Sequence, residues 1–222
     1  MTIDMEDLIN SIMASLGRID FIRPEEIPNI DLYMDQVTSY IDTHLKNTAR
    51  HQGKDRILTK TMINNYAKND LLPPPAKKKY NKEHILLLVF IYYFKNILSI
   101  SDIQQMLGPM AEKYYGKDGK VTIEKIYNEV IGAQRDRVDD FKETILETFR
   151  QSRDSFEELP EGEEKEFLQL FAFICDLSFD VYVKKLMIEK IIDGYTEKHE
   201  AERERRRAAA GRTSGEKRDK NH

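Results

Sequence analysis

The segment Leu58–Leu107, LTKTMINNYAKNDLLPPPAKKKYNKEHILLLVFIYYFKNILSISDIQQML, decides how we interpret the fold. Its pattern is that of a short helix with a polar face, a basic loop stiffened by prolines, an apolar helix and a second short helix. In this order the elements predict an all-α protein that contains a winged helix-turn-helix domain.

The first helix of this segment is expected to begin after Thr59, whose hydroxyl can accept a hydrogen bond from a first-turn backbone amide, and to run to about Asn69. One face is apolar, whereas the opposite face carries only cations, amides and hydroxyls, from Lys60, Thr61, Asn64, Asn65 and Lys68. Lysine neutralises phosphate, and the asparagine amide can pair with the edge of adenine. This face therefore predicts a DNA-reading surface, with an ordinary solvated helix face as the alternative.

The loop that follows presents a cluster of positive charge. Its consecutive prolines, Pro73–Pro75, fix the backbone in an extended form, and Lys77, Lys78 and Lys79 come soon after them. We interpret the three lysines as a short wing that meets the phosphate backbone, and we include Tyr80 beside them. A solvated run of charge is the alternative.

The distribution of charge favours a polyanion partner for this region. Residues 54–82 contain eight Lys and Arg against two Asp, a net charge of +6, within a chain whose formal net charge is -4. The rest of the chain must then carry -10. Such segregation suits a nucleic-acid site, because each neutralised phosphate adds affinity that does not depend on sequence.

From Thr59 to Leu107 the sequence resembles the DNA-binding domain of MerR-type transcriptional regulators. The pattern of that family is a helix ending in Leu-Arg-x-Tyr, a Gly-Leu-Leu-x-Pro loop, a Tyr-Ser-x-Glu-Asp helix start and a closing Leu-x-x-Ile-x-x-Leu-Leu helix. The resemblance implies a winged helix-turn-helix that binds DNA. The matching residues are Ile63, Tyr66, Leu71, Leu72, Pro73, Pro74, Tyr80, Ile85, Ile100, Ile103 and Leu107.

The chain departs from the MerR pattern at three points. Asn64 stands at the position of the phosphate-binding arginine, Asp70 stands at the position of the glycine, and the wing between Pro75 and Tyr80 is shorter by several residues. Residues from roughly 30 to 110 also resemble the bacterial family catalogued as domain of unknown function 1836, through the LTKTMINNY and LLPPPAKKKY blocks. That resemblance implies a helix-turn-helix fold and attaches no activity to it.

Two further helices complete the predicted domain. The run His84–Phe94, with Asn81 as its N-cap, is apolar almost all round, and because it is far shorter than the roughly 20 residues that cross a bilayer, we expect it in the core. Leu32–Leu45 is expected as the first helix, with Tyr33 in its apolar stripe. The insertion between Leu45 and Thr59 leaves two interpretations open: it contains an extra strand or wing, or the first helix is not the structural partner of the second.

Composition divides the chain into four parts, and it predicts a helical C-terminal region that dimerises or binds an effector. Two copies of a reading helix are needed on a palindromic site, so we favour dimerisation. A final helix is expected from about Glu163 to Tyr195, with an extension to about Ala210. The four parts of the chain are an amphipathic N-terminal helix that ends at Gly17 plus a linker (1–30), the helix-turn-helix domain up to the break at Gly108-Pro109 (31–108), an acidic helical region (109–196) and a charged, disordered tail (197–222).

Several functional classes are disfavoured by what the sequence lacks. Its single cysteine, Cys175, lies in an apolar run where we expect it to be buried, and it fits a reducing, cytoplasmic location. The five histidines show no metal-binding spacing, and no glycine-rich phosphate loop is present. The acidic N-terminus shows no secretory signal. We therefore expect no enzyme activity, no metal, no cofactor and no membrane contact.

The leading hypothesis is a cytoplasmic, dimeric transcriptional regulator that binds double-stranded DNA, with the effector unknown. The alternative is a protein-interaction adaptor on a helix-turn-helix scaffold that no longer binds DNA, in which the basic patch docks an acidic partner. The residues expected at the DNA are Thr59, Lys60, Thr61, Asn64, Asn65, Lys68, Lys77, Lys78, Lys79 and Tyr80.

Overall fold

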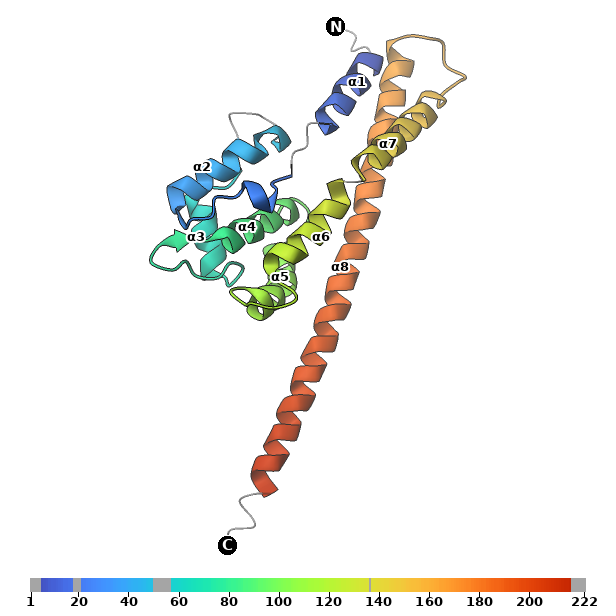
Figure 1. Ribbon diagram of the computed structural model, residues 1–222. Coiled ribbons are helices and arrows are strands. Elements are labelled where there is room, and N and C mark those ends of the chain that lie inside the picture. The colour runs from blue at the N-terminus through green and yellow to red at the C-terminus, as the bar shows by residue number, and fades with distance from the viewer. Residues whose placement is uncertain (1–4, 18–20, 50–56, 136, 217–222) are drawn as a thin grey trace. The chain divides into compact units, whose positions relative to one another are not determined.

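The computed structural model describes residues 5–17, 21–49, 57–135 and 137–216, and it is mostly helical, as the all-α prediction requires (Figure 1). The chain divides into two units, residues 1–182 and residues 183–222, and the boundary falls within one helix, α8. In chain order the elements are α1 (Met5–Leu16), the 3-10 helix η1 (Pro24–Glu26), β1 (Leu32–Tyr33), α2 (Met34–Leu45), the 3-10 helix η2 (Lys46–Thr48), α3 (Lys60–Lys68), β2 (Lys79–Tyr80), α4 (Lys82–Phe94), α5 (Ile100–Tyr114), α6 (Ile123–Arg135), α7 (Val138–Arg153) and α8 (Glu163–Glu216).

Helix α4 forms the centre of the domain that carries the candidate site. Asn81 caps it, because its side-chain oxygen accepts a hydrogen bond from the backbone N–H of His84 at 3.1 Å. All residues from His84 to Tyr92 are buried, and α2, β2, α5 and α6 contact this helix (Figure 1). The predicted core helix is thereby confirmed, and burial of its apolar side chains stabilises the domain.

A small antiparallel ribbon joins the segment before α2 to the segment before α4. Strand β1 pairs with β2, so that Leu32 lies opposite Tyr80 and Tyr33 lies opposite Lys79. Helix α2 contacts α3, and the carboxylate of Asp42 accepts a hydrogen bond from the backbone N–H of Ile57 at 3.1 Å. Of the two interpretations of the insertion, the one in which α2 and α3 are not partners is therefore wrong. The other interpretation placed an extra strand or wing between Leu45 and Thr59; the described start of this insertion is the 3-10 helix η2, and residues 50–56 lie outside the described residues.

The compact domain extends beyond the predicted limits of 31–108. Ile22 and Ile27 are buried, and so are Ile123 and Tyr127 of α6. The hydroxyl of Tyr127 donates a hydrogen bond to the backbone carbonyl of Ile22 at 2.7 Å, and burial raises the pKa of this hydroxyl. The segment before β1 and helix α6 therefore belong to the same core as α4.

Two predicted helix ends differ from the structure. Helix α5 continues through Pro109, where we expected a break, because buried Ile103 and Leu107 anchor it and a proline removes only one backbone donor. Helix α7 ends at Arg153, so Phe156 does not share its face as expected. Phe156 instead occupies a left-handed turn with φ of 57°.

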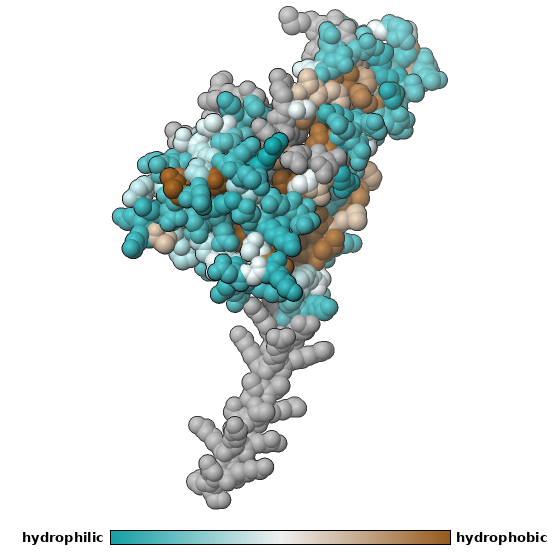
Figure 2. Space-filling view, in the orientation of Figure 1, coloured by the Kyte–Doolittle hydropathy of each residue, from teal (hydrophilic) through white to brown (hydrophobic). Residues whose placement is uncertain are grey.

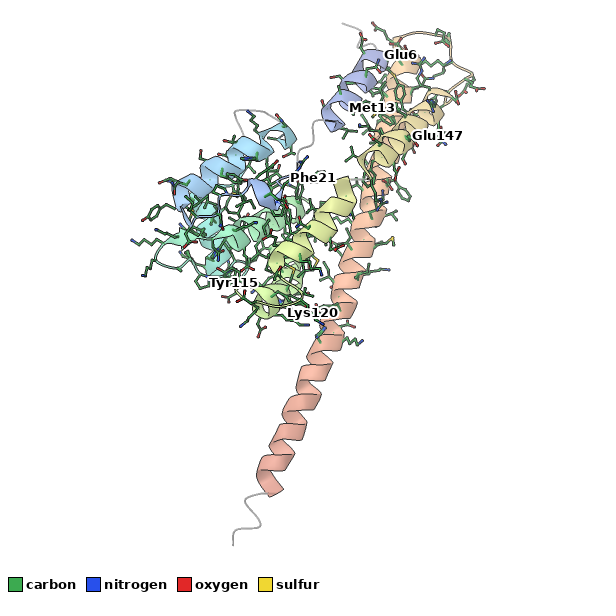
Figure 3. All side chains as sticks on the ribbon, viewed as in Figure 1. Glu6, Met13, Phe21, Tyr115, Lys120 and Glu147 are labelled. Carbon is green, nitrogen blue, oxygen red and sulfur yellow. The ribbon has the colours of Figure 1, made fainter. Side chains whose placement is uncertain are left out.

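Helices α1, α7 and the first part of α8 share a second apolar cluster. Phe149 of α7 meets Phe173 of α8 edge to face, with ring centroids 5.4 Å apart, and Met5 and Ile9 of α1 join them. Met13, labelled in Figure 3, packs against the same cluster from α1. The amphipathic N-terminal helix thus packs on the body of the chain, one of the two placements expected for it.

Helix α8 departs from prediction in its length and in one exposed residue. Its backbone is helical to Glu216, beyond the expected end near Ala210, in the segment for which a disordered tail was expected. Cys175 is exposed, which corrects the expectation that it is buried, because only one face of α8 packs on α1 and α7. Among the described residues, no helix has the length and apolar character needed to cross a membrane.

Candidate nucleic-acid interface

Helix α3 is fixed at both ends and along its inner face. The hydroxyl of Thr59 accepts a hydrogen bond from the backbone N–H of Met62 at 3.2 Å, which confirms the predicted N-cap. Ile63 and Tyr66 are buried, and the carbonyl of Tyr66 accepts hydrogen bonds from the backbone N–H groups of the two leucines that follow the helix. The hydroxyl of Thr59 therefore serves the helix, and the outer face is held in a fixed orientation.

The outer face of α3 is exposed along its whole length. Its exposed residues are those predicted from the sequence: Lys60, Thr61, Asn64, Asn65 and Lys68. The side chains of Asn64, Asn65 and Lys68 make no hydrogen bond or ion pair with any other residue that the structure describes. Their donors and acceptors are therefore available to an external partner, and leaving them in water carries no penalty.

The three lysines form a tight turn with unusual backbone geometry. Lys77 and Lys78 both have positive φ, 51° and 64°, and the backbone N–H of Lys79 donates to the carbonyl of Ala76 at 2.9 Å. Positive φ at both central residues defines a type I′ turn, which normally selects Asn and Gly. Two non-glycine residues in this conformation cost about 1 kcal/mol or more each. We call Ala76–Lys79 the lysine turn, and its exposed tip presents Lys77 and Lys78.

His84 connects the start of α4 to the proline-rich loop that carries the lysine turn. Its side chain is 1% exposed. Its Nδ1 lies 3.0 Å from the backbone nitrogen and 2.7 Å from the side-chain oxygen of Asn81, and its Nε2 donates to the carbonyl of Pro73 at 3.2 Å. The hydroxyl of Tyr115, labelled in Figure 3, lies 3.1 Å from both ring nitrogens.

Burial sets the protonation state of this histidine. Desolvation lowers the pKa of His84, while the carbonyls of Pro73 and Pro74 and the carboxylate of Asp31 act in the opposite direction. Burial of the ring thus favours the neutral imidazole. Sequence reasoning placed His84 only at the start of an apolar helix, because its hydrogen-bond partners become neighbours only in the fold.

Strand β1 brings the lysine turn and the start of α3 to one place on the surface. The ammonium of Lys79 lies 5.1 Å from the ring centroid of Tyr33, a cation–π contact. Two residues further along, Asp35 forms an ion pair with Lys60 at the start of α3. Because Tyr33 and Asp35 are so close in sequence, the lysine turn and the polar face of α3 border the same short segment.

Three of the sequence expectations for this surface need correction. Tyr80 is 2% exposed and packs in the core, so its side chain is not part of an interface. Tyr33 was expected in the apolar stripe of the first helix, but it precedes α2 and is 54% exposed. The surface is also not free of carboxylates, because α2 places Asp35 against Lys60.

Two lysines of the same domain make contacts within the fold. Lys82 forms an ion pair with Glu124 of α6 at 2.8 Å, and the ammonium of Lys95 donates to the backbone carbonyl of Ile57 at 2.9 Å. Burial lowers the pKa of Lys95. Among the described residues of α3 and the lysine turn, the cations left for an external anion are Lys68, Lys77 and Lys78, while Lys60 and Lys79 contact neighbouring side chains.

Comparison with known proteins gives a family match for part of the chain and no function. Residues 22–130 match the model of a family described as "Domain of unknown function (DUF1836)". This range runs from the segment that Tyr127 holds to the end of the apolar part of α6, so it coincides with the compact domain built around α4. No curated protein and no solved structure matches the chain.

Proposed function

We propose that this chain, whose residues 22–130 belong to the DUF1836 family, is a cytoplasmic DNA-binding transcriptional regulator that acts as a dimer. In this proposal, helix α3 enters the major groove with Thr61, Asn64, Asn65 and Lys68 towards the bases and phosphates. The lysine turn lies against the neighbouring phosphate backbone. Thr59 and Tyr80 hold the surface in place without contacting DNA.

The observation that carries the proposal is the combination of a rigid polar helix with a strained lysine turn beside it. The fold stabilises α3 through its cap and its buried face, yet leaves two amides and a lysine on its outer face without partners among the described residues. It also holds Lys77 and Lys78 in a conformation that favours Asn and Gly. Strain of this kind persists where the surrounding structure imposes it, commonly at binding sites.

Two features support the finer assignment to a winged helix-turn-helix of the MerR type. Asp70, at the position of the family's glycine, has φ of 54°, the left-handed conformation that glycine adopts most easily. The bridge between Ala76 and Lys79 closes a minimal hairpin at the position of the wing. Asn64 remains different from the family's arginine, so in this chain the phosphate contacts are assigned to lysines.

The adaptor function is the second candidate, and Asp35 favours it. This carboxylate lies beside Lys60 and would repel a phosphate that approached the start of α3. The exposed ring of Tyr33 next to it suits a protein surface. In that case the lysine turn would dock an acidic polypeptide.

The proposal is tested by changing the charge of the lysine turn while keeping its geometry. In Lys77→Asn/Lys78→Gly, the turn receives the residues that a type I′ turn prefers, so the fold is retained and two charges are lost. We expect a mixed-sequence duplex to bind about tenfold more weakly at 100 mM salt, and the log–log salt dependence to become shallower by about two. Fluorescence anisotropy of labelled duplex at several salt concentrations measures both.

A matched control removes two lysines from another exposed loop of the same domain. Lys117 and Lys120 follow α5, and Lys120 is labelled in Figure 3. The variant Lys117→Asn/Lys120→Gly should keep the wild-type salt dependence of DNA binding. If the two variants behave alike, the lysine turn is not at the DNA. Immunoprecipitation from cells then separates the two functions, because a regulator enriches particular DNA fragments whereas an adaptor enriches an acidic polypeptide.

A further inference from the structure

The first part of α8 has one covered face and one exposed apolar face. Leu170, Phe173 and Leu177 pack into the cluster with α1 and α7. On another face, Phe167, Phe171, Ile174 and Val181 are 64%, 54%, 52% and 59% exposed. Figure 2 shows hydrophobic surface, in brown, along α8. Isolated exposed apolar residues are ordinary, but a continuous row of them marks an interaction surface.

The exposed residues follow the spacing of a helix–helix contact. Phe167, Phe171, Ile174, Ser178 and Val181 are separated alternately by four and three residues, and we call these five residues the α8 seam. This alternation keeps all five on one side of a helix, as the core positions of a coiled coil require. Tyr182 and Cys175, both exposed, widen the same side.

We propose that the α8 seam is the contact surface between two copies of this chain, packed helix against helix about a two-fold axis. A two-fold axis places the same patch on both sides of the interface. A charged residue on the axis would therefore meet its own copy and be repelled, and none of the five seam residues is charged. A partner of opposite charge, by contrast, would find nothing on the seam to recognise.

The extent of the surface agrees with a dimer. Each half-exposed phenylalanine, tyrosine or large aliphatic side chain leaves about 100 Å² exposed, so Phe167, Phe171, Ile174, Val181 and Tyr182 together present about 500 Å². The flanking residues add to this, and stable interfaces bury about 800 Å² on each partner. The inference deepens the proposed function by naming the surface of its dimer, but it is tested without DNA.

The test compares the mass of the full chain in solution with that of two variants. Phe171→Glu/Ile174→Glu places two charges in the seam, and Asp176→Lys changes a charge on the opposite side of α8. We expect wild type and Asp176→Lys to have twice the chain mass of 26.1 kDa, and the seam variant to have 26.1 kDa. Light scattering after size exclusion gives the masses. Circular dichroism checks that helix content is unchanged, as expected for substitutions at exposed positions.

The mass measurement and the DNA titration distinguish failure of the seam from failure of DNA binding. A wild-type chain of 26.1 kDa, an assembly of more than two copies, or a seam variant that stays dimeric overturns the assignment of the seam. A dimeric wild type that shows no salt-dependent binding to duplex DNA overturns the regulator function and leaves the seam in place. A monomeric wild type that still binds DNA through the lysine turn overturns the seam and the dimeric part of the proposed function, and leaves the DNA-binding surface in place.

Discussion

Helices α4 and α8 are both rich in apolar residues, yet these residues are buried to different extents. In α4, every residue from His84 to Tyr92 is buried, because α2, α5 and α6 surround the helix. In α8, apolar residues on one face pack on α1 and α7 while those of the seam remain exposed. Apolar composition thus predicts that a helix needs covering, but only the fold shows whether the same chain supplies the cover.

The largest expected effect on stability comes from shortening a buried side chain of α4. Leu87 is fully buried at its centre, so Leu87→Ala removes apolar contacts and leaves a cavity. We expect the free energy of unfolding to fall by about 3 kcal/mol. Urea denaturation followed by circular dichroism measures this loss. A loss below about 1 kcal/mol would mean that α4 is not the centre of the core.

An intermediate effect is expected at the start of the same helix. His84→Gln removes the ring that contacts Asn81 and donates to Pro73, and we expect it to cost about 1–2 kcal/mol at pH 7.5. Because burial lowers the pKa of His84, the unfolded chain takes up a proton at higher pH than the folded chain does. Wild-type stability is therefore fully present above about pH 6.5 and declines as the pH falls below it.

The pH dependence is measured by urea denaturation of both proteins between pH 7.5 and pH 5. His84→Gln cannot be protonated, so the decline in stability below pH 6.5 should be smaller in the variant than in wild type. Parallel curves would show that the pKa of His84 does not change on folding.

The smallest effect on folding is expected in α8. Val181 belongs to the seam and is more than half exposed, so Val181→Ala should change the unfolding free energy of the single chain by less than about 0.5 kcal/mol. At higher protein concentration, where a dimer stabilises the fold by mass action, the difference should grow. Thermal unfolding over a range of concentrations checks this. A large difference that is independent of concentration would place Val181 in a core of its own chain and abolish the contrast with α4.

Local signals in the sequence predicted the elements of the candidate site. Thr59 and Asn81 were identified as N-caps from residue type and position alone, and both make the expected hydrogen bond. The apolar and polar faces of α3 also followed from helical spacing, since exposed Asn64 and Asn65 lie between buried Ile63 and Tyr66. These features depend on neighbours within one helical turn, which the sequence displays directly.

Contacts between distant segments were not predictable in this way. The two-residue strands β1 and β2 are too short to show a period, and their pairing is what exposes Tyr33 and buries Tyr80. Asp35 likewise reaches Lys60 only because α2 packs on α3. The net charge of the surface around α3 therefore depends on tertiary contacts as well as on the residues of the helix itself.

The hydrogen bond between Tyr127 and Ile22 has a consequence for how residues 22–130 can be joined to other polypeptide segments. The bond brings together the beginning and the end of the matched range, residues 22 and 130, which are far apart in sequence. A folded module that starts and finishes at one point can be spliced into a host polypeptide, or permuted through a new opening, with little disturbance to its interior. From this closure by Tyr127 we expect residues 22–130 to tolerate insertion into another polypeptide.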